Sequence, residues 1–247
     1  MDLGLADRVY LVTGGSKGLG FATAAALVAD GAKVVLSSRS QDNVDAAVAK
    51  LGANAIGVAG DNADAGLGER MVAAATSHFG RVDGLLVSVG GPPLGGVLDT
   101  SEQAWQDAFS SVFVGTLRLV RRVVEELRDG GAIGLVLSTS VREPLPNLAI
   151  SNGLRPGLAM VGKTLADEVG PRGIRVVSLL PGAINTERNA ALLADPAAVA
   201  KRTAGIPLRR IAEPEEFGRV AAFALSPAAS YLTGCVLAVD GGALKAL

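Results

Sequence analysis

The sequence predicts an α/β protein built on a doubly wound, seven-stranded parallel sheet with helices on both faces. Short apolar runs alternate with helix-like segments along the whole chain. Several of these runs are apolar almost without interruption, which is typical of parallel strands buried on both faces. The 247 residues contain no evident linker or internal repeat, so we expect a single domain over residues 1–247.

Each element is justified by its local pattern. The expected strands are the apolar runs Val9–Val12, Lys33–Ser37, Ala55–Ala59, Gly84–Val89, Ala132–Leu137, Ile174–Leu180 and Val236–Val239. The expected helices are Leu19–Ala29, Asn43–Leu51, Leu67–Phe79, a long one from Thr100 or Ser101 to about Arg128, one ending near Val169, one within 183–207, and one opened by Pro214. Thr100 or Ser101 can cap the long helix, because a hydroxyl oxygen accepts a hydrogen bond from a free backbone N–H of the first turn.

Pro156 lies inside the segment that ends near Val169. Proline removes a helical hydrogen bond and clashes with the preceding turn, at a cost of about 3 kcal/mol. We therefore expect this helix to start late, with Ser151 or Asn152 as its cap, or to bend at Pro156.

Composition and charge indicate which classes of binding partner to expect. Hydrophobic residues make up 49% of the chain and charged residues 19%, as in globular proteins. The net charge is −1 and no run of Lys and Arg exceeds two residues, so no nucleic-acid partner is expected. Charged residues interrupt every apolar stretch before about 18 residues, so no membrane partner is expected. The single cysteine, Cys235, and an N-terminus unlike a signal peptide favour a cytoplasmic protein, and no metal site is predicted.

A glycine-rich turn, Thr13–Gly20, joins the first strand to the first helix. Such a turn frees backbone N–H groups, and the helix N-terminus adds partial positive charge, so a phosphate can bind there. The sequence therefore predicts a nucleotide site, with a glycine turn that binds nothing as the alternative.

In a doubly wound sheet, ligands bind beyond the carboxyl ends of the strands. The residues that follow each strand are therefore the site candidates. They are Thr13–Gly20, Ser38-Arg39, Asp61-Asn62, Ser88–Gly91, Ser138–Ser140 and Pro181–Thr186.

Thr13-Gly14-Gly15-Ser16-Lys17-Gly18-Leu19-Gly20 resembles the cofactor motif Thr-Gly-x-x-x-Gly-x-Gly of the short-chain dehydrogenase/reductase family. The resemblance extends over nearly the whole chain and is nearest to the 3-oxoacyl-carrier-protein reductase-like subgroup. The other segments that carry it are Phe79–Asp83, Pro181–Thr186, Pro214–Glu216, Tyr231–Gly234 and Val239–Gly242. It implies a single-domain Rossmann fold, a small-molecule carbonyl or oxoacyl substrate, and a homotetramer or homodimer.

The resemblance also implies which residues bind a dinucleotide. Those at the pyrophosphate would be Thr13, Gly14, Ser16, Lys17, Gly18, Leu19 and Gly20. Asp61 and Asn62 would lie at the adenine, and Gly90, with Ser88 near it, along the adenosine ribose. Pro181, Gly182, Ile184 and Thr186 would lie towards the nicotinamide, and residues 183–207 would form a lid over the substrate.

The end of the second strand indicates which dinucleotide is bound. An acidic residue there would hydrogen-bond the ribose 2′-hydroxyl of NAD, but this chain has Ser38-Arg39. Arg39 and Lys17 place two cations where a 2′-phosphate would lie, which favours NADP over NAD. The alternative is that both cations are merely solvated.

The resemblance breaks at the catalytic positions. The family uses a serine, a tyrosine, a lysine four residues after that tyrosine, and an asparagine on the long helix. Here Ser138 stands at the serine position, Ser151 at the tyrosine, Arg155 at the lysine and Val112 at the asparagine. A serine hydroxyl is a poorer acid than a tyrosine, and arginine stays protonated, so the proton path must differ from the family's.

Other proton donors are few. Tyr10 and Tyr231 are the two tyrosines of the chain, and we expect both to be packing residues. Glu143, in the loop after Ser138, could donate a proton if burial raised its pKa, or could be a solvated loop charge.

Three functions remain open. The first is an NADP-dependent carbonyl or 3-oxoacyl reductase in which Ser138 holds the carbonyl, Arg155 the ribose, and water or Glu143 supplies the proton. The second is a dinucleotide-binding pseudoenzyme or sensor without turnover. The third is a non-redox dehydration or isomerisation in which Arg155 binds an anionic substrate.

Overall fold

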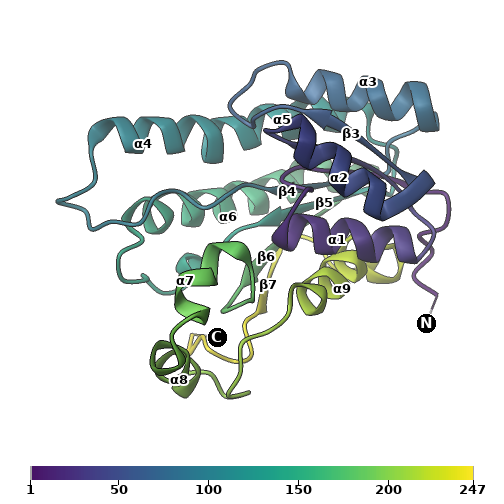
Figure 1. Cartoon of the computed structure of the whole chain (residues 1–247). Coiled ribbons are helices and arrows are strands. Elements are labelled where there is room, and N and C mark those ends of the chain that lie inside the picture. Colours follow the sequence, from purple (N-terminus) through teal and green to yellow (C-terminus); the bar gives the residue numbers. More distant parts are fainter. Residues whose placement is uncertain (1, 247) are drawn as a thin grey trace.

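A computed structural model describes residues 2–246 and places seven strands in one sheet (Figure 1). The strands are β1 (Val9–Val12), β2 (Lys33–Ser38), β3 (Ala55–Ala59), β4 (Gly84–Ser88), β5 (Ala132–Val136), β6 (Arg175–Pro181) and β7 (Cys235–Val239). Their order is β3-β2-β1-β4-β5-β6-β7, and every neighbouring pair is parallel. The predicted fold class is confirmed. Met1 and Leu247, which the predicted domain includes, lie outside the described residues.

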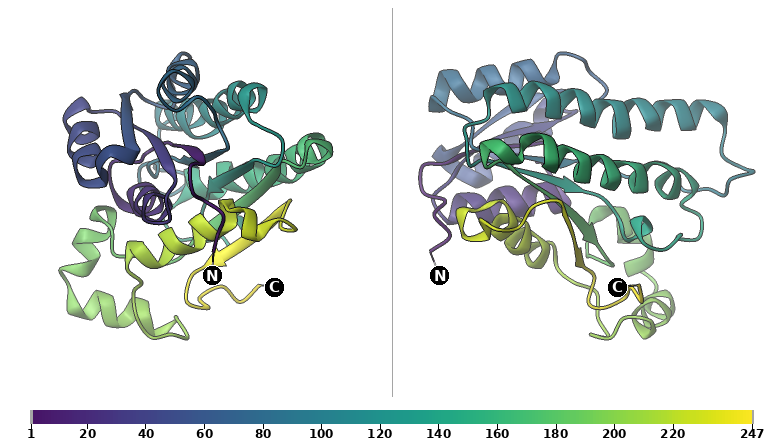
Figure 2. Two further views of the ribbon diagram at one scale, coloured as in Figure 1. Left: turned by 90° about the vertical axis from the view of Figure 1, so that its right-hand side faces the viewer. Right: turned by 180° about the vertical axis from the view of Figure 1, so that it is seen from behind.

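Helices cover both faces of the sheet (Figure 2). One hydrophobic core joins the strands to α1 (Gly18–Ala29), α2 (Gln41–Leu51) and α9 (Pro214–Leu225). A second core, on the opposite face, joins them to α3 (Leu67–Phe79), α5 (Gly115–Glu126) and α6 (Ala149–Val169). The strand order reverses between β1 and β4, and such a reversal opens the crevice in which doubly wound proteins bind ligands.

The predicted long helix consists of three parts. Ser101 caps α4 (Glu102–Ala108), and its hydroxyl accepts a hydrogen bond from the Ala104 N–H at 3.2 Å. A π-helical segment, Phe109–Val114, then leads into α5. Val112, which the resemblance aligns with the family's asparagine, lies in this π-helical segment and is buried.

The predicted late start of α6 is wrong. The helix begins at Ala149, with Leu148 at its cap position, and continues through Pro156 without a break. Neither Ser151 nor Asn152 serves as the cap, because both side chains have tertiary partners. The Asn152 amide accepts from the Leu145 N–H at 3.1 Å and donates to the Leu145 carbonyl at 2.9 Å.

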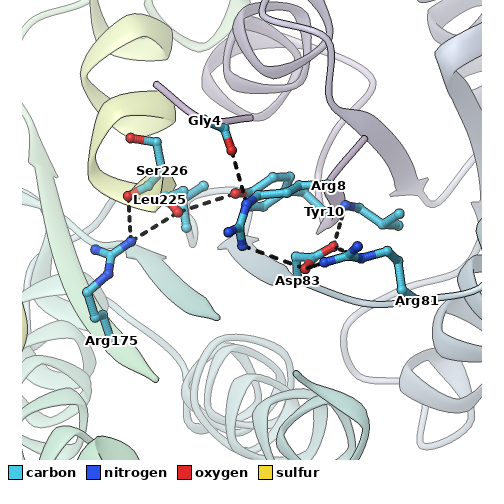
Figure 3. Close-up of polar contacts among 9 residues, drawn as sticks. Gly4, Arg8, Tyr10, Arg81, Asp83, Arg175, Leu225 and Ser226 are labelled. Atoms are coloured by element: carbon cyan, nitrogen blue, oxygen red, sulfur yellow. Dashed lines mark hydrogen bonds and ion pairs between the residues drawn. The ribbon is translucent and has the colours of Figure 1, made fainter. Parts of the chain in front are cut away.

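A polar cluster closes the amino ends of the strands, away from the glycine turn (Figure 3). The Arg175 guanidinium donates to the carbonyls of Ala224, Leu225 and Ser226, at the C-terminal end of α9, at 2.7, 3.1 and 2.8 Å. Burial lowers the pKa of Arg175. The Tyr10 hydroxyl donates to the Leu225 carbonyl at 3.4 Å, which places this tyrosine in the core as predicted.

The same cluster joins β1 to β4. The buried Asp83 carboxylate accepts from the Val9 N–H at 2.9 Å and from the Arg81 guanidinium at 2.7 Å. Arg8 lies 3.7 Å from the same carboxylate. Buried charge is tolerated here because it is paired and hydrogen-bonded.

Tyr231 was expected to pack, but its side chain is fully exposed, so that prediction is wrong. Between residues 2 and 246, no helix has both the length and the apolar character needed to cross a bilayer. Within the same range, no group of three or more His, Cys, Asp and Glu residues could hold a metal ion.

Candidate functional site

The glycine turn lies at the carboxyl end of β1 and requires glycine at specific positions. Gly14 has a φ of +57°, and a Cβ there would lie 2.4 Å from the Ser88 carbonyl oxygen. At Gly20, a Cβ would lie 2.3 Å from the carbonyl oxygen of Gly14. The turn can therefore form only with these glycines, and it delivers the chain into α1 at Gly18.

Hydroxyl groups fix the turn to its neighbouring strands. The Thr13 hydroxyl accepts from the Ser88 N–H at 3.0 Å and donates to the Ser88 carbonyl at 3.2 Å, which ties β1 to β4. The Ser16 hydroxyl donates to the Ser38 hydroxyl at 2.8 Å, which ties the turn to β2. Thr13, Ser16 and Ser88 thus hold the glycine turn in shape.

Both cations expected at the 2′-phosphate have carboxylate neighbours. The Lys17 ammonium lies 3.2 Å from the Glu187 carboxylate, and the Arg39 Nε lies 4.0 Å from the Asp61 carboxylate. The Arg39 side chain is 84% exposed. Exposed pairs such as these are worth at most about 1 kcal/mol, so a more highly charged ligand can displace the carboxylate.

The end of β3 carries Asp61 and Asn62. Asp61 accepts a hydrogen bond from the Ala63 N–H at 2.8 Å, which shapes the turn. The Asn62 amide nitrogen is buried and has no hydrogen-bond partner among the described residues. It lines a cavity of about 10 Å³ with Asp64 and Arg118. A cavity of this size and polarity has room for about one water molecule.

Further along the same edge of the sheet, the chain leaves space beside Gly90. A Cβ added at Gly90 would meet no atom within 4 Å. At the end of β6, Gly182 packs directly against the Asp240 backbone, and Ile184 is buried. Thr186 lies against the glycine turn, since its Cγ2 would be 3.6 Å from a Cβ placed at Gly18. The residues expected at the ribose and the nicotinamide therefore share one edge with the glycine turn.

A pair of buried hydroxyls follows β5. The Ser140 and Ser151 hydroxyl oxygens lie 3.1 Å apart, and both side chains are buried. Ser138, the serine that the sequence favoured, instead accepts a hydrogen bond from the Ser140 N–H at 3.1 Å and caps a short 3₁₀ turn, Thr139–Val141. The geometry thus brings Ser140, and not Ser138, to Ser151.

The resemblance assigns this position to Ser138, but the local pattern alone does not separate Ser138 from its neighbours. Ser138, Thr139 and Ser140 all carry hydroxyls and all follow the same strand. Only the 3₁₀ turn decides which hydroxyl faces α6. The available signal was the run of three hydroxyl residues itself, which marks the segment and leaves the residue open.

Arg155 lies one turn after Ser151 and is buried. Its Nη1 donates to the Val136 carbonyl, at the end of β5, at 2.9 Å. Arg155 therefore lies beside the serine pair as a fixed positive charge that cannot release a proton.

Glu143 has a structural role that the sequence did not reveal. Its Oε1 accepts hydrogen bonds from the Lys245 and Ala246 N–H groups, both at 3.0 Å. The carboxylate therefore fixes the C-terminal segment to the loop after β5, and it is not simply a solvated charge. The same loop is bonded to the segment after β4, where the Gly95 N–H donates to the Asn147 carbonyl at 2.9 Å.

The segment after β6 contains the expected helical structure. A 3₁₀ turn (Glu187–Asn189) is followed by α7 (Ala190–Leu193) and α8 (Pro196–Ala204). Figure 1 shows α7 and α8 as a projection beside the carboxyl ends of β6 and β7. Asp195 caps α8 by accepting from the Ala197 N–H at 2.9 Å.

Comparisons with known proteins agree with this arrangement. The family model described as "Enoyl-(Acyl carrier protein) reductase" matches residues 14–243. Dehydrogenase/reductase SDR family member 4 of Bos taurus is 37% identical over 98% of this chain and 89% of its own length.

Two solved structures share the whole fold. A short-chain dehydrogenase/reductase (glucose/ribitol dehydrogenase) from Brucella melitensis has a TM-score of 0.94 and 28% identity, with 100% of both chains covered. L-sorbose reductase from Gluconobacter frateurii, solved in complex with NADPH and L-sorbose, has a TM-score of 0.93 and 31% identity, again with 100% of both chains covered. The parallel sheet, the glycine turn and these matches lead to one conclusion: this chain belongs to the short-chain dehydrogenase/reductase family of oxidoreductases, which use NAD(P)(H) and act on small molecules.

Proposed function

We propose that this protein is an NADP(H)-dependent reductase of a small carbonyl compound. The observation that carries the proposal is the glycine turn at β1, which accepts only glycine at Gly14 and Gly20 and has Lys17 within it and Arg39 beside it. Support comes from the open space at Gly90 and from the L-sorbose reductase that was solved with NADPH.

The residues of the turn fit the phosphates of a dinucleotide. The backbone of Thr13, Gly14, Ser16, Gly18, Leu19 and Gly20 would hold the pyrophosphate, while Lys17 and Arg39 would hold the 2′-phosphate. Asp61, Asn62, Ser88 and Gly90 would lie along the adenosine, and Pro181, Gly182, Ile184 and Thr186 near the nicotinamide. NADPH supplies a hydride when bound, and the protein must hold the carbonyl and supply a proton.

Ser140 takes the role that the sequence had given to Ser138. Its hydroxyl would hold the substrate carbonyl, and Ser151 would be its partner. Each hydroxyl is both a donor and an acceptor, so the pair can pass a proton from water to the carbonyl oxygen. Arg155 would hold the nicotinamide ribose and stabilise negative charge that develops on that oxygen.

The first test is cofactor binding followed by turnover. NADPH should bind the wild-type protein more tightly than NADH in a fluorescence titration, and Lys17→Met with Arg39→Met should abolish that preference. NADPH oxidation should then be detected with a panel of ketones and 3-oxoacyl thioesters. Preferential binding of NADH would contradict the cofactor assignment.

Substitutions of Ser140 and Ser138 form a matched pair of variants that tests the catalytic role of Ser140. Ser140→Ala should lower kcat by about 10²-fold or more, as loss of a proton-transfer or oxyanion contact does. Ser138→Ala should change kcat much less, because its hydroxyl only caps a turn. An equal loss of kcat in both variants, or a loss confined to Ser138→Ala, would contradict the role of Ser140.

A second function, a dinucleotide-binding protein without turnover, is favoured by two observations. Val112 is buried and apolar at the family's asparagine position, and Arg155 donates to the Val136 carbonyl. This function predicts tight NADPH binding, no oxidation with any carbonyl compound, and no effect of Ser140→Ala on binding.

A further inference from the structure

The glycine turn and the segment after β6 touch at two adjacent points. The Lys17 ammonium lies 3.2 Å from Oε2 of Glu187, the first residue of the 3₁₀ turn that precedes α7. One residue earlier, Thr186 lies against Gly18, as described above. Lys17 is the only charged side chain in the turn Thr13–Gly20. Among the described residues, the segment therefore lies against the glycine turn through this ion pair, with Thr186 close to Gly18.

The ion pair between Lys17 and Glu187 is exposed, so another anion can replace Glu187 as the partner of Lys17. The Lys17 side chain is 54% exposed and that of Glu187 is 75% exposed, so water and salt screen their attraction. A phosphate carries more charge than a carboxylate, and its hydrogen bonds with an ammonium are charge-assisted. A phosphate at the glycine turn would therefore compete with Glu187 for Lys17 and would be repelled by the carboxylate if it stayed.

We propose that Glu187 tunes dinucleotide affinity: its carboxylate holds the segment after β6 on Lys17 in the free protein and is displaced by the phosphate of the bound dinucleotide. The inference rests on the proposed cofactor site. It assigns to Glu187 two linked effects: it weakens dinucleotide binding, and it couples that binding to release of residues 187–193 from the glycine turn. Because coupling is reciprocal, removal of the carboxylate must strengthen binding of the phosphate.

The test compares dinucleotide affinities in a double-mutant cycle. Glu187→Gln keeps the shape of the side chain and removes its charge, and it should tighten NADPH binding about three- to tenfold, because the phosphate then no longer competes with a carboxylate for the Lys17 ammonium. In a Lys17→Met background the same change should have no effect. Glu215→Gln, an exposed carboxylate on the first turn of α9, removes the same charge elsewhere and should leave affinity unchanged.

A second readout needs no cofactor. In hydrogen–deuterium exchange of the free protein, residues 187–193 should exchange faster in Glu187→Gln than in wild type, and 0.5 M NaCl should produce the same increase in wild type.

The outcomes separate this inference from the proposed function. Wild-type binding of NADPH with no gain in Glu187→Gln, or with a gain that persists in Lys17→Met, would overturn the role of Glu187 and leave the cofactor site intact. Unchanged exchange at residues 187–193 in Glu187→Gln would overturn it as well. Failure of wild type and Glu187→Gln alike to bind NADPH or NADH would overturn both.

Discussion

At the scale of single residues, the site is defined by what its side chains can do with a proton. Ser140 and Ser151 form a buried hydroxyl pair, and Arg155 beside them is a permanent cation. Neither of the chain's two tyrosines belongs to this pair. Tyr10 lies in the core at the amino ends of the strands, and Tyr231 is exposed. In the proposed reductase, proton transfer therefore uses hydroxyls and water.

Tyr10 gives a prediction about stability at high pH. Burial raises its pKa to about 12, from an ordinary value of 10.0. The folded state therefore favours the neutral phenol, and its contribution to stability is complete below pH 10 and is lost as the pH rises from 10 to 12. The free energy of unfolding should fall by roughly 2–3 kcal/mol over this range, since one pKa unit is about 1.4 kcal/mol.

Urea titrations at pH 8, 10 and 11.5 check this behaviour. Tyr10→Phe should remove the Tyr10 part of the decline, so the curves of variant and wild type should converge at high pH. A decline of equal size in both proteins would show that Tyr10 ionisation is not its cause.

At the scale of elements, close approach between helices depends on particular small residues. Gly218 in α9 faces the backbone of α1, and a Cβ there would lie 2.4 Å from the Ala22 carbonyl oxygen. Backbone cannot move aside as a side chain can. The contact between α1 and α9 therefore requires glycine, even though glycine is a poor helix former.

Gly218→Ala should destabilise the protein by about 1–3 kcal/mol, because the overlap with α1 outweighs a propensity gain of about 1 kcal/mol. Chemical denaturation measures the effect. Arg219→Ala, the adjacent exposed position, should change stability by less than about 0.5 kcal/mol. A more stable Gly218→Ala variant would contradict the close packing of α1 on α9.

Replacement of Pro156 should stabilise the protein, in contrast to replacement of Gly218. Pro156 lies within α6, where it lacks the N–H that would bond to the Asn152 carbonyl. Pro156→Ala should restore that bond and raise the free energy of unfolding by about 1–2 kcal/mol, after allowance for the greater freedom of the unfolded chain. Thermal unfolding followed by circular dichroism tests this, and a lower melting temperature would show that the proline ring contributes packing that outweighs the lost hydrogen bond.

At the scale of the whole molecule, the amino and carboxyl ends of the strands have different roles. The amino ends of β1, β4 and β6 are closed by paired and hydrogen-bonded charges, which hold distant parts of the chain together (Figure 3). The carboxyl ends carry the glycine turn and the serine pair. At the amino end, Arg175 joins β6 to the C-terminal carbonyls of α9.

Arg175→Met should lower the free energy of unfolding by about 2–4 kcal/mol, since it leaves several buried carbonyls without donors. Arg175→Lys should recover little, because a lysine ammonium cannot reproduce the planar fork of the guanidinium. Arg121→Met removes the same charge from an exposed position of α5 and serves as the control. The prediction fails if Arg175→Met is as stable as that control.

The sequence alone determined the fold class, the glycine turn and the edge of the sheet that carries the candidate site. These depend on local patterns, namely apolar runs of strand length, the spacing of glycines, and the rule that parallel strands end on the same side. The tertiary structure decided the partners of individual side chains. It placed Ser140 rather than Ser138 against Ser151, Glu187 against Lys17, Glu143 against the C-terminal backbone, and Asn152 against Leu145. No local pattern contains these pairings, because each depends on how turns and helices far apart in the chain are brought together when the sheet is assembled.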